Sequence, residues 1–174
     1  LPRTLQVVSY NVWELYDGGG RDRYLARRHA DSLTPGDVKL RVAKLAAQIR
    51  AAKPHVIAFQ EIEDARLACR VAALAVTGSK WTCAAGRWGR RDTPQNVAVA
   101  SRVGGTFSVL TPRRRYAPRG AVALTLPGGK LTVLSVHLKS SRGARGYADC
   151  RNAARREGLA RALHTWLDQL DDGR

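Results

Sequence analysis

Three short apolar runs of this chain each carry one polar residue at or near their end, and this pattern constrains the fold more than any other feature. The runs cover residues 7–13, 56–61 and 134–140, and the polar residues are Asn11, Glu61 and His137. Enzymes with α/β folds build sites from strands that bury their apolar body and present polar side chains at their C-terminal ends. The sequence therefore predicts one site assembled from three strand ends.

Helical periodicity separates the first two runs. Residues 4–10 have the composition of a buried strand, and residues 55–60 have that of the next strand. Between them, Asp37 is the expected N-cap of a helix that runs to about residue 53, and Pro54 ends this helix. A strand–helix–strand order predicts that the two strands pair in parallel.

The remaining elements predict a strand-rich second half. A helix is expected over residues 64–76, a hairpin turn at 127–129 and a long helix over 149–170. Short strands are expected at 81–84, 96–102, 105–110, 121–126 and 130–137. The fold class is therefore α/β (α+β), with a mixed β-sheet sandwich flanked by helices, and residues 1–174 are expected to belong to a single domain.

The charge of the chain is strongly unbalanced. It has 30 Lys and Arg residues against 14 Asp and Glu residues, a net charge of +16, and Arg dominates the basic set. Because Arg grips phosphate with two donors, this excess favours polyanionic partners. A genome of high GC content, in which Arg and Ala codons are frequent, explains the same composition, so both interpretations stay open. No apolar run approaches the roughly 18 residues that cross a bilayer.

The three cysteines predict one disulfide. Cys69 and Cys83 lie 14 residues apart and can join a helix to the following strand, while Cys150 stays free or pairs outside this segment. No Cys-x-x-Cys sequence is present, which argues against a zinc site. The chain starts at Leu1 without an initiating Met, so a signal peptide could have been removed. We therefore expect a secreted or periplasmic bacterial protein.

The three polar strand ends have complementary chemistry. A carboxylate such as Glu61 at a buried strand end must be ion-paired or bound to a metal, and Mg²⁺ needs only one or two carboxylates. Asn11 can contact a phosphate oxygen or support the metal, and the His137 imidazole can exchange a proton near pH 7. Each residue taken singly also has a structural explanation: a salt bridge to Arg for Glu61, a turn for Asn11 and a packing role for His137.

Further basic and polar residues point to phosphate. Arg119 precedes a strand between small neighbours, Asn96 opens another strand, and Lys139 follows His137, so these three are candidate phosphate-binding residues. Runs of Arg with interleaved aromatic residues cover residues 87–91, 113–116 and 142–156. Arg and aromatic side chains together are typical of nucleic-acid grooves, although each run alone is also typical of a solvated face.

These segments together resemble the endonuclease/exonuclease/phosphatase superfamily, which has a deoxyribonuclease-like fold. The matching segments occur in the family's order: Ser-Tyr-Asn-Val-Trp, Phe-Gln-Glu, Pro-Arg-Gly and Ser-Val-His-Leu-Lys-Ser. The resemblance implies that Glu61 is the metal carboxylate, that Asn11 contacts phosphate and supports the metal, and that His137 is the acid/base histidine. It implies a phosphate contact for Arg119, and Asn96 falls near another substrate-contacting position.

Two segments of the family pattern are not found in this sequence. Family members continue into a strand that ends Gly-Asp-x-Asn and later into a Ser-Asp-His sequence. We therefore expect the chain to be the N-terminal portion of such a domain. A C-terminal fragment or second chain would then complete the fold and would be needed for activity.

The resulting prediction is a divalent-metal-dependent phosphodiester hydrolase, in the first place a nuclease acting on DNA or RNA. The expected cofactor is Mg²⁺, with Mn²⁺ or Ca²⁺ as alternatives. A lipid or small-molecule phosphoesterase of the same fold is a second reading, which an exposed apolar loop would favour. A non-catalytic module that binds nucleic acid through its basic surface is a third reading.

Overall fold

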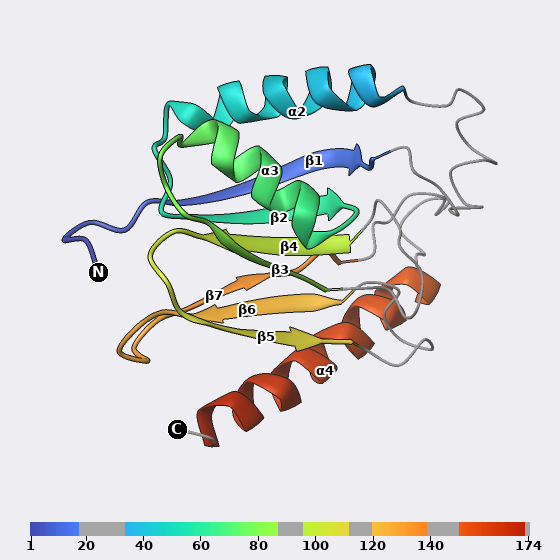
Figure 1. The fold of residues 1–174 in the computed structure, drawn as a ribbon. Coiled ribbons are helices and arrows are strands. Elements are labelled where there is room, and N and C mark those ends of the chain that lie inside the picture. The colour runs from blue at the N-terminus through green and yellow to red at the C-terminus, as the bar shows by residue number, and fades with distance from the viewer. Residues whose placement is uncertain (18–33, 87–95, 112–119, 139–149, 173–174) are drawn as a thin grey trace.

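Two β-sheets form the centre of the computed structural model, which describes residues 1–17, 34–86, 96–111, 120–138 and 150–172 (Figure 1). The first sheet has the order β1-β2-β4-β3 and the second the order β5-β6-β7. The strands are β1 (Val7–Leu15), β2 (Val56–Ile62), β3 (Thr82–Gly86), β4 (Asn96–Ser101), β5 (Thr106–Leu110), β6 (Ala121–Thr125) and β7 (Thr132–Ser135). β1 and β2 are parallel and every other pair is antiparallel, so the predicted mixed sheet is confirmed.

Helices cover the outer faces of both sheets. α2 (Pro35–Arg50) and α3 (Ala65–Ala75) lie on the first sheet, and α4 (Cys150–Asp172) lies on the second (Figure 1). Val42 and Ile49 of α2 are buried in the core of the first layer, and Leu159 and Trp166 of α4 are buried at the other side. These are the faces that the apolar periodicity predicts. Among the described residues, no helix is both long and apolar enough to cross a membrane.

The start of α2 differs from the prediction. Thr34, and not Asp37, is the N-cap: the Thr34 Oγ1 accepts a hydrogen bond from the Asp37 backbone N–H at 3.2 Å. The Asp37 carboxylate accepts in return from the Thr34 backbone N–H at 2.9 Å, which completes a capping box. Hydrogen bonds from the Thr34 side chain and backbone lower the pKa of the Asp37 carboxyl. The helix begins earlier because Pro35, which has no N–H, suits the first helical turn.

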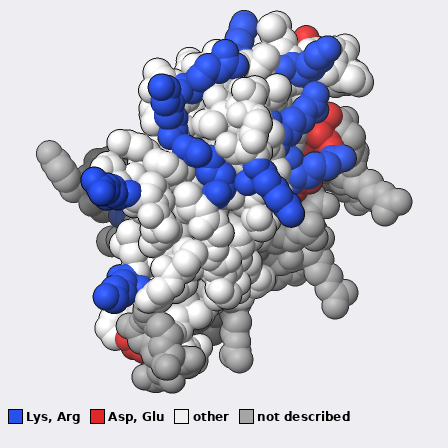
Figure 2. Space-filling view, turned by 60° about the vertical axis from the view of Figure 1, so that its left-hand side comes forward, with Lys and Arg blue, Asp and Glu red and all other residues white. Residues whose placement is uncertain are grey.

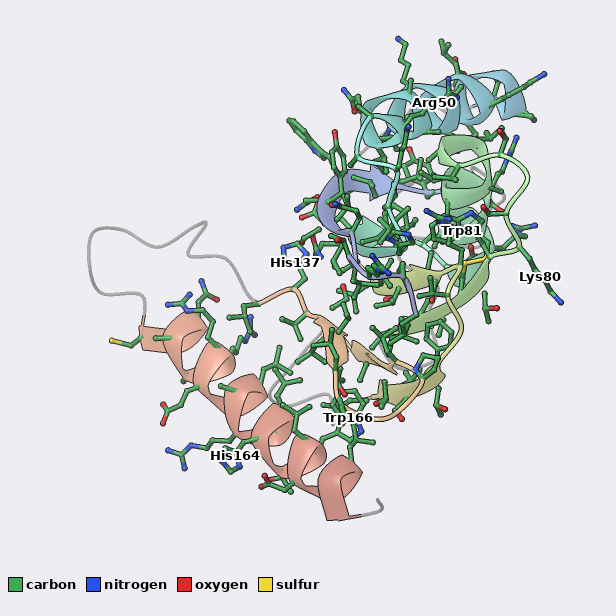
Figure 3. All side chains as sticks on the ribbon, turned by 90° about the vertical axis from the view of Figure 1, so that its left-hand side faces the viewer. Arg50, Lys80, Trp81, His137, His164 and Trp166 are labelled. Carbon is green, nitrogen blue, oxygen red and sulfur yellow. A yellow bond between two sulfur atoms is a disulfide. The ribbon has the colours of Figure 1, made fainter. Side chains whose placement is uncertain are left out.

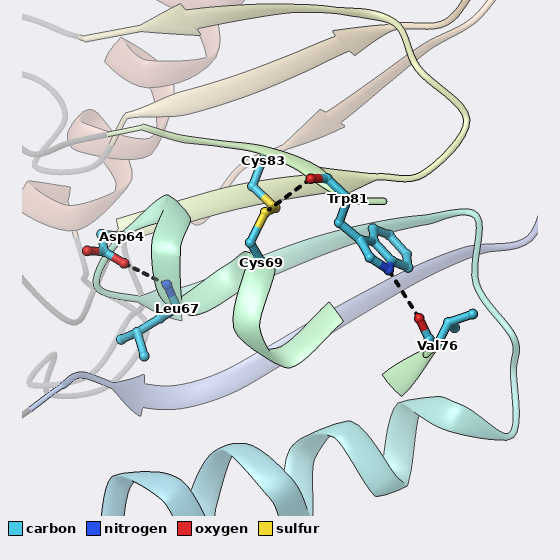
Figure 4. Close-up of a disulfide and its surroundings, with 6 residues drawn as sticks. All are labelled: Asp64, Leu67, Cys69, Val76, Trp81 and Cys83. Carbon is cyan, nitrogen blue, oxygen red and sulfur yellow. Dashed lines mark hydrogen bonds between the residues drawn. A yellow bond between two sulfur atoms is a disulfide. The ribbon is translucent and has the colours of Figure 1, made fainter. Parts of the chain in front are cut away.

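The predicted disulfide is present. Cys69 of α3 and Cys83 of β3 are joined, with their Cα atoms 5.8 Å apart (Figure 4). Beside it, the Trp81 indole N–H donates to the Val76 carbonyl at 3.5 Å. Closing a loop of this length stabilises a fold by about 3 kcal/mol. The disulfide therefore fixes the middle of α3 against the edge strand of the first sheet, and Cys150 is an exposed free thiol.

The predicted hairpin between β6 and β7 is also confirmed. Its turn places Gly128 and Gly129 at φ of +89° and +70°, a region that glycine enters without strain. The Leu126 N–H donates to the Leu131 carbonyl at 2.9 Å across the turn. The hairpin returns the chain toward the first sheet, so β7 delivers His137 to the site.

Candidate active site

The regular pairing of β1 and β2 breaks where the site residues lie. Asn11 pairs with Gln60, and Leu15 pairs with Ile62. Between these two pairs β1 advances by four residues and β2 by only two. On the other side of β2, Gln60 pairs with Val97 and Ile62 with Asn96, which leaves Glu61 as the extra residue of a β-bulge. The sequence predicted that Asn11 and Glu61 end their strands. In the structure both residues lie within their strands, because β1 continues to Leu15 and β2 to Ile62.

Glu61 has an unusual backbone conformation. Its φ is +61°, in the left-handed region that non-glycine residues seldom occupy. Such a conformation costs on the order of 1–3 kcal/mol and persists only where the surrounding structure enforces it. The bulge and this φ together turn the Glu61 side chain out of the regular alternation of β2.

Asn96 supports the segment that follows Glu61. It is fully buried, and its Nδ2 donates to the Glu63 carbonyl at 2.8 Å. The Glu63 N–H donates in turn to the Leu15 carbonyl at 2.9 Å. Asn96 thus holds the turn between β2 and α3, and its expected phosphate contact stays a prediction.

Arg41 of α2 supports the opposite side of the bulge. Its guanidinium donates to the carbonyl oxygens of Val12, Trp13 and Glu14, at 3.4 Å for Val12 and 3.0 Å for Glu14. Trp13 and Glu14 have φ of +50° and +54°, so this guanidinium holds two further strained residues. No motif in the sequence marks Arg41, although it lies at a position where the apolar stripe of α2 faces the sheet.

Trp13 lies beside Asn11 and points into solvent. The Asn11 Oδ1 accepts a hydrogen bond from the Trp13 N–H at 2.9 Å, and 78% of the Trp13 residue surface is exposed. An indole of this size is seldom left so open to water. In the sequence, Trp13 is the last residue of the first apolar run and has no other distinguishing signal.

Glu61 and His137 come together from the two sheets. The His137 Nε2 lies 3.6 Å from the Glu61 Oε1, and the two side chains are 18% and 19% exposed. His137 follows β7, which ends at Ser135 and not at residue 137 as predicted. Figure 3 shows His137 between the first sheet and α4. The predicted meeting of these two residues is therefore present in the structure.

Hydrogen bonds between the sheets fix the position of this pair. The Ser135 hydroxyl donates to the Phe59 carbonyl at 2.9 Å. The Gln60 amide lies at hydrogen-bond distance from Ser135 Oγ and from Ser9 Oγ, 3.4 Å in each case. Glu61 and His137 thus extend from backbone segments that are tied to one another, which limits how far the pair can separate.

The other candidate phosphate-binding residues cannot be placed. Arg119 and Lys139 lie outside the described residues, as do the basic runs 87–91, 113–116 and most of 142–156. Their roles stay predictions.

A family model describes almost the whole chain. The model of the Endonuclease/Exonuclease/phosphatase family matches residues 8–173. The chain belongs to this family. Its members include metal-dependent nucleases and phosphatases, are largely hydrolytic enzymes and are generally dependent on divalent metals. None of the curated proteins matches the chain.

Solved structures that are similar to the chain include two proteins of this family. One is an endonuclease/exonuclease/phosphatase family protein from Leptotrichia buccalis C-1013-b, with 14% identity and a TM-score of 0.46 over 86% of this chain and 62% of the other. The second is an endonuclease/exonuclease/phosphatase from Beutenbergia cavernae DSM 12333, with 22% identity and a TM-score of 0.49 over 94% of this chain and 43% of the other. The chain thus spans less than two thirds of either protein.

Carboxylates are concentrated at the site end of the first sheet. They lie where β1 and β2 end and where α2 and α3 begin, and comprise Glu14, Asp17, Asp37, Glu61, Glu63 and Asp64. Several have structural contacts: Asp64 caps α3 at 2.8 Å, Glu63 accepts from the Asp17 N–H at 2.7 Å, and Asp17 pairs with Arg66. Glu61 instead contacts His137, and about a fifth of its side-chain surface stays exposed.

This arrangement suits a divalent cation held by few protein atoms. The described residues contain no group of three or more His, Cys, Asp and Glu side chains that could hold a metal ion. A hard cation such as Mg²⁺ needs only one or two carboxylates, with water and substrate phosphate completing its coordination. Glu61 would supply the carboxylate, and Asn11, whose strand partner is Gln60, lies next to it.

Proposed function

We propose that the chain is the part of a divalent-metal-dependent phosphodiesterase that carries its acid/base histidine, and that the enzyme is a nuclease acting on DNA or RNA. The observation that carries this proposal is the Glu61–His137 pair, a carboxylate and an imidazole brought within 3.6 Å from two sheets. Metal-assisted hydrolysis of a phosphodiester can use both groups, the carboxylate to bind the cation and the imidazole to transfer a proton. The disulfide supports a secreted or periplasmic location, because disulfides persist in oxidising compartments.

Each site residue has a definite part in this reaction. Water attacks phosphorus, one P–O ester bond breaks, and the leaving oxygen acquires a proton. His137 accepts the proton of the water or delivers one to the leaving oxygen, while Glu61 and Asn11 hold the cation. When bound, that cation supplies Lewis-acid polarisation of the phosphoryl oxygen. Arg119 is proposed to neutralise the phosphoryl charge, and Lys139 is proposed to contact the phosphate.

The exposed Trp13 indole supports nucleic acid as the substrate. It lies two residues beyond Asn11, and the contacts of Asn11 and Arg41 hold its backbone while its ring stays in water. A nucleobase that stacks on such a ring contributes about 1–3 kcal/mol, whatever the sequence. The basic composition of the chain favours the same partner.

Trp13→Ala is therefore expected to weaken the binding of oligonucleotides. The loss of one stacked base should raise KM for an oligonucleotide about 5- to 100-fold. Trp13→Phe should recover most of this loss because a ring remains, and hydrolysis of a small aryl phosphodiester should not change. Leu40→Ala is the matched control, since Leu40 is another exposed apolar residue, on α2.

The same variant tests a lipid substrate, which an exposed indole near a phosphoesterase site also favours. Vesicle flotation and oligonucleotide titration would be run in parallel. A loss of vesicle binding in Trp13→Ala with oligonucleotide KM unchanged would contradict the nuclease proposal and support a lipid phosphoesterase.

Metal removal gives the direct test of activity. Plasmid DNA, RNA and a small aryl phosphodiester would be incubated with the purified protein in Mg²⁺ and in EDTA. We expect cleavage of polynucleotide in Mg²⁺, its loss in EDTA and its return when Mg²⁺ is added in excess. Salt-sensitive binding with no cleavage in Mg²⁺, Mn²⁺ or Ca²⁺ would contradict catalysis by this chain and indicate a binding module.

A further inference from the structure

The layer of helices on the first sheet has strongly segregated charge. No Asp or Glu occurs from residue 38 to 60 or from residue 65 to 86, although these segments contain Lys39, Lys44, Arg50, Arg70 and Lys80 among their basic residues. Figure 2 shows Lys and Arg side chains gathered around an uncharged area, with Asp and Glu at the margins of the view. The carboxylates of this layer lie at the site end of the first sheet, where some basic residues also lie, and the opposite end carries basic residues without them.

Contacts made by two cations at that opposite end tie together α2, α3 and the segment that follows β4. The Arg50 guanidinium, at the end of α2, donates to the Leu74 carbonyl of α3 at 3.1 Å. Arg102, which follows β4, donates to the carbonyls of Pro54 at 2.7 Å and Lys53 at 3.2 Å. These bonds to backbone oxygens orient two guanidiniums and leave further donors for a ligand.

Two more exposed cations border this area. Lys80 lies between the end of α3 and β3, beside Trp81, on the same side of the first sheet as Arg50 (Figure 3). Arg70 lies one helical turn before Leu74 on α3. We call the area formed by Arg50, Lys53, Arg70, Lys80 and Arg102 the distal basic surface.

The environment of His55 reflects the positive charge here. Its Nδ1 accepts a hydrogen bond from the Gln6 N–H at 3.0 Å, so the bonded imidazole is the neutral form. Burial, and after it the positive charge of Arg102, lower the pKa of His55 below its ordinary value.

We propose that the distal basic surface binds the phosphodiester backbone of nucleic acid, at a place separate from the Glu61–His137 site. The choice of nucleic acid rests on the proposed function. Each guanidinium is planar, and its donors match the oxygens of a phosphate. The described part of these segments contains no neighbouring carboxylate, so the attraction between these cations and a phosphate is not cancelled. The surface would hold a long polynucleotide while a distant segment of the same strand occupies the site.

The length of α2 sets how long a polynucleotide must be to reach both the site and the distal basic surface. A helix of 16 residues spans about 24 Å, because each residue rises about 1.5 Å. At about 3.4 Å per nucleotide, roughly seven nucleotides cover the path from the site end to the distal basic surface. Oligonucleotides of about four residues should therefore gain nothing from this surface, and those longer than about ten should gain the full effect.

Two variants with equal loss of charge test the proposal. The surface variant is Lys53→Gln/Lys80→Gln, which leaves the structural contacts of Arg50 and Arg102 in place. The control variant is Lys130→Gln/Arg161→Gln, which removes the same number of charges from the β6–β7 turn and from a part of α4 outside the basic run 142–156. Binding of single-stranded 30-mer and 4-mer DNA would be followed by fluorescence anisotropy in EDTA as salt is varied.

The surface variant should bind the 30-mer about 10- to 100-fold more weakly at 0.1 M salt, with the log–log salt slope reduced by about two. The control variant should lose less than about threefold, and the 4-mer should not distinguish the variants. Hydrolysis of a small aryl phosphodiester should be equal in all three proteins. If no protein hydrolyses it, the proposed function fails while the binding comparison still decides this proposal.

Equal weakening by both variants would overturn the proposal, because net charge alone would then explain binding. Selective loss of binding to phosphatidylglycerol vesicles, with 30-mer binding retained, would also overturn it and identify the surface as one for membranes.

Discussion

Replacing His137 by alanine is expected to lower the turnover of a phosphodiester by about 100- to 10,000-fold, the range that a positioned acid/base group contributes. Its Nε2 lies 3.6 Å from the Glu61 carboxylate, so an imidazole at this place is within reach of a phosphate held by a cation on Glu61. Binding of the polynucleotide should change little, because the proton transfer that His137 provides is needed in the transition state and not in the ground state.

His164→Ala is the matched control for this variant. His164 also lies beside a carboxylate, with its Nδ1 2.9 Å from Asp168 Oδ2, but it is on an exposed part of α4 away from the sheets (Figure 3). Turnover would be measured in Mg²⁺, the dissociation constant in EDTA and the unfolding midpoint in urea. A fall in binding equal to the fall in turnover, or an equal effect of His164→Ala, would contradict an acid/base role for His137.

The sequence predicts much of this fold because burial leaves a simple signal. β2 and β4 are buried on both faces and appear as continuous apolar runs, and α3 and α4 show regular helical periodicity. Asn11, Glu61 and His137 are recognisable because each interrupts such a run. Parallel pairing of β1 with β2 then places Asn11 opposite Gln60, the residue before Glu61.

The local geometry of the site could not be predicted in the same way. A bulge changes the register by one residue without changing the composition, so Glu61 reads as a strand end although β2 continues to Ile62. The positive φ of Trp13, Glu14 and Glu61 is imposed by tertiary contacts, among them the bonds from Arg41. Propensities describe local preference, and here long-range hydrogen bonds override it.

The start of α2 illustrates a narrower limit. Thr34 and Asp37 are both good capping residues, three positions apart, and a capping box uses both. Their types alone do not say which is the cap, because the answer depends on which residue has the extended backbone. In the structure Thr34 has φ of −72° and ψ of 157°, and the helix begins after it.

Removing the Glu61 carboxylate is expected to have the largest effect of any single change. Glu61→Ala should abolish metal-dependent hydrolysis. In the described part of the site, Glu61 is the carboxylate that lies beside His137 and is proposed to bind the cation. We expect Mg²⁺ to raise the unfolding temperature of the unaltered protein and not that of Glu61→Ala, since a ligand stabilises only the state that binds it. Glu157→Gln is the control, because Glu157 is an exposed carboxylate on α4 that pairs with Arg161. Hydrolysis retained in Glu61→Ala would contradict the assignment.

Glu61→Gly separates the role of the side chain from the conformation of its backbone. Alanine keeps a Cβ at φ of +61°, whereas glycine occupies this region freely, so Glu61→Gly should be about 1 kcal/mol more stable than Glu61→Ala in urea unfolding. Both variants should be equally inactive because both lack the carboxylate. If glycine is no more stable than alanine, the left-handed backbone stores no strain. If it is more stable and still inactive, this position keeps a strained glutamate for catalysis at a cost to the stability of the fold.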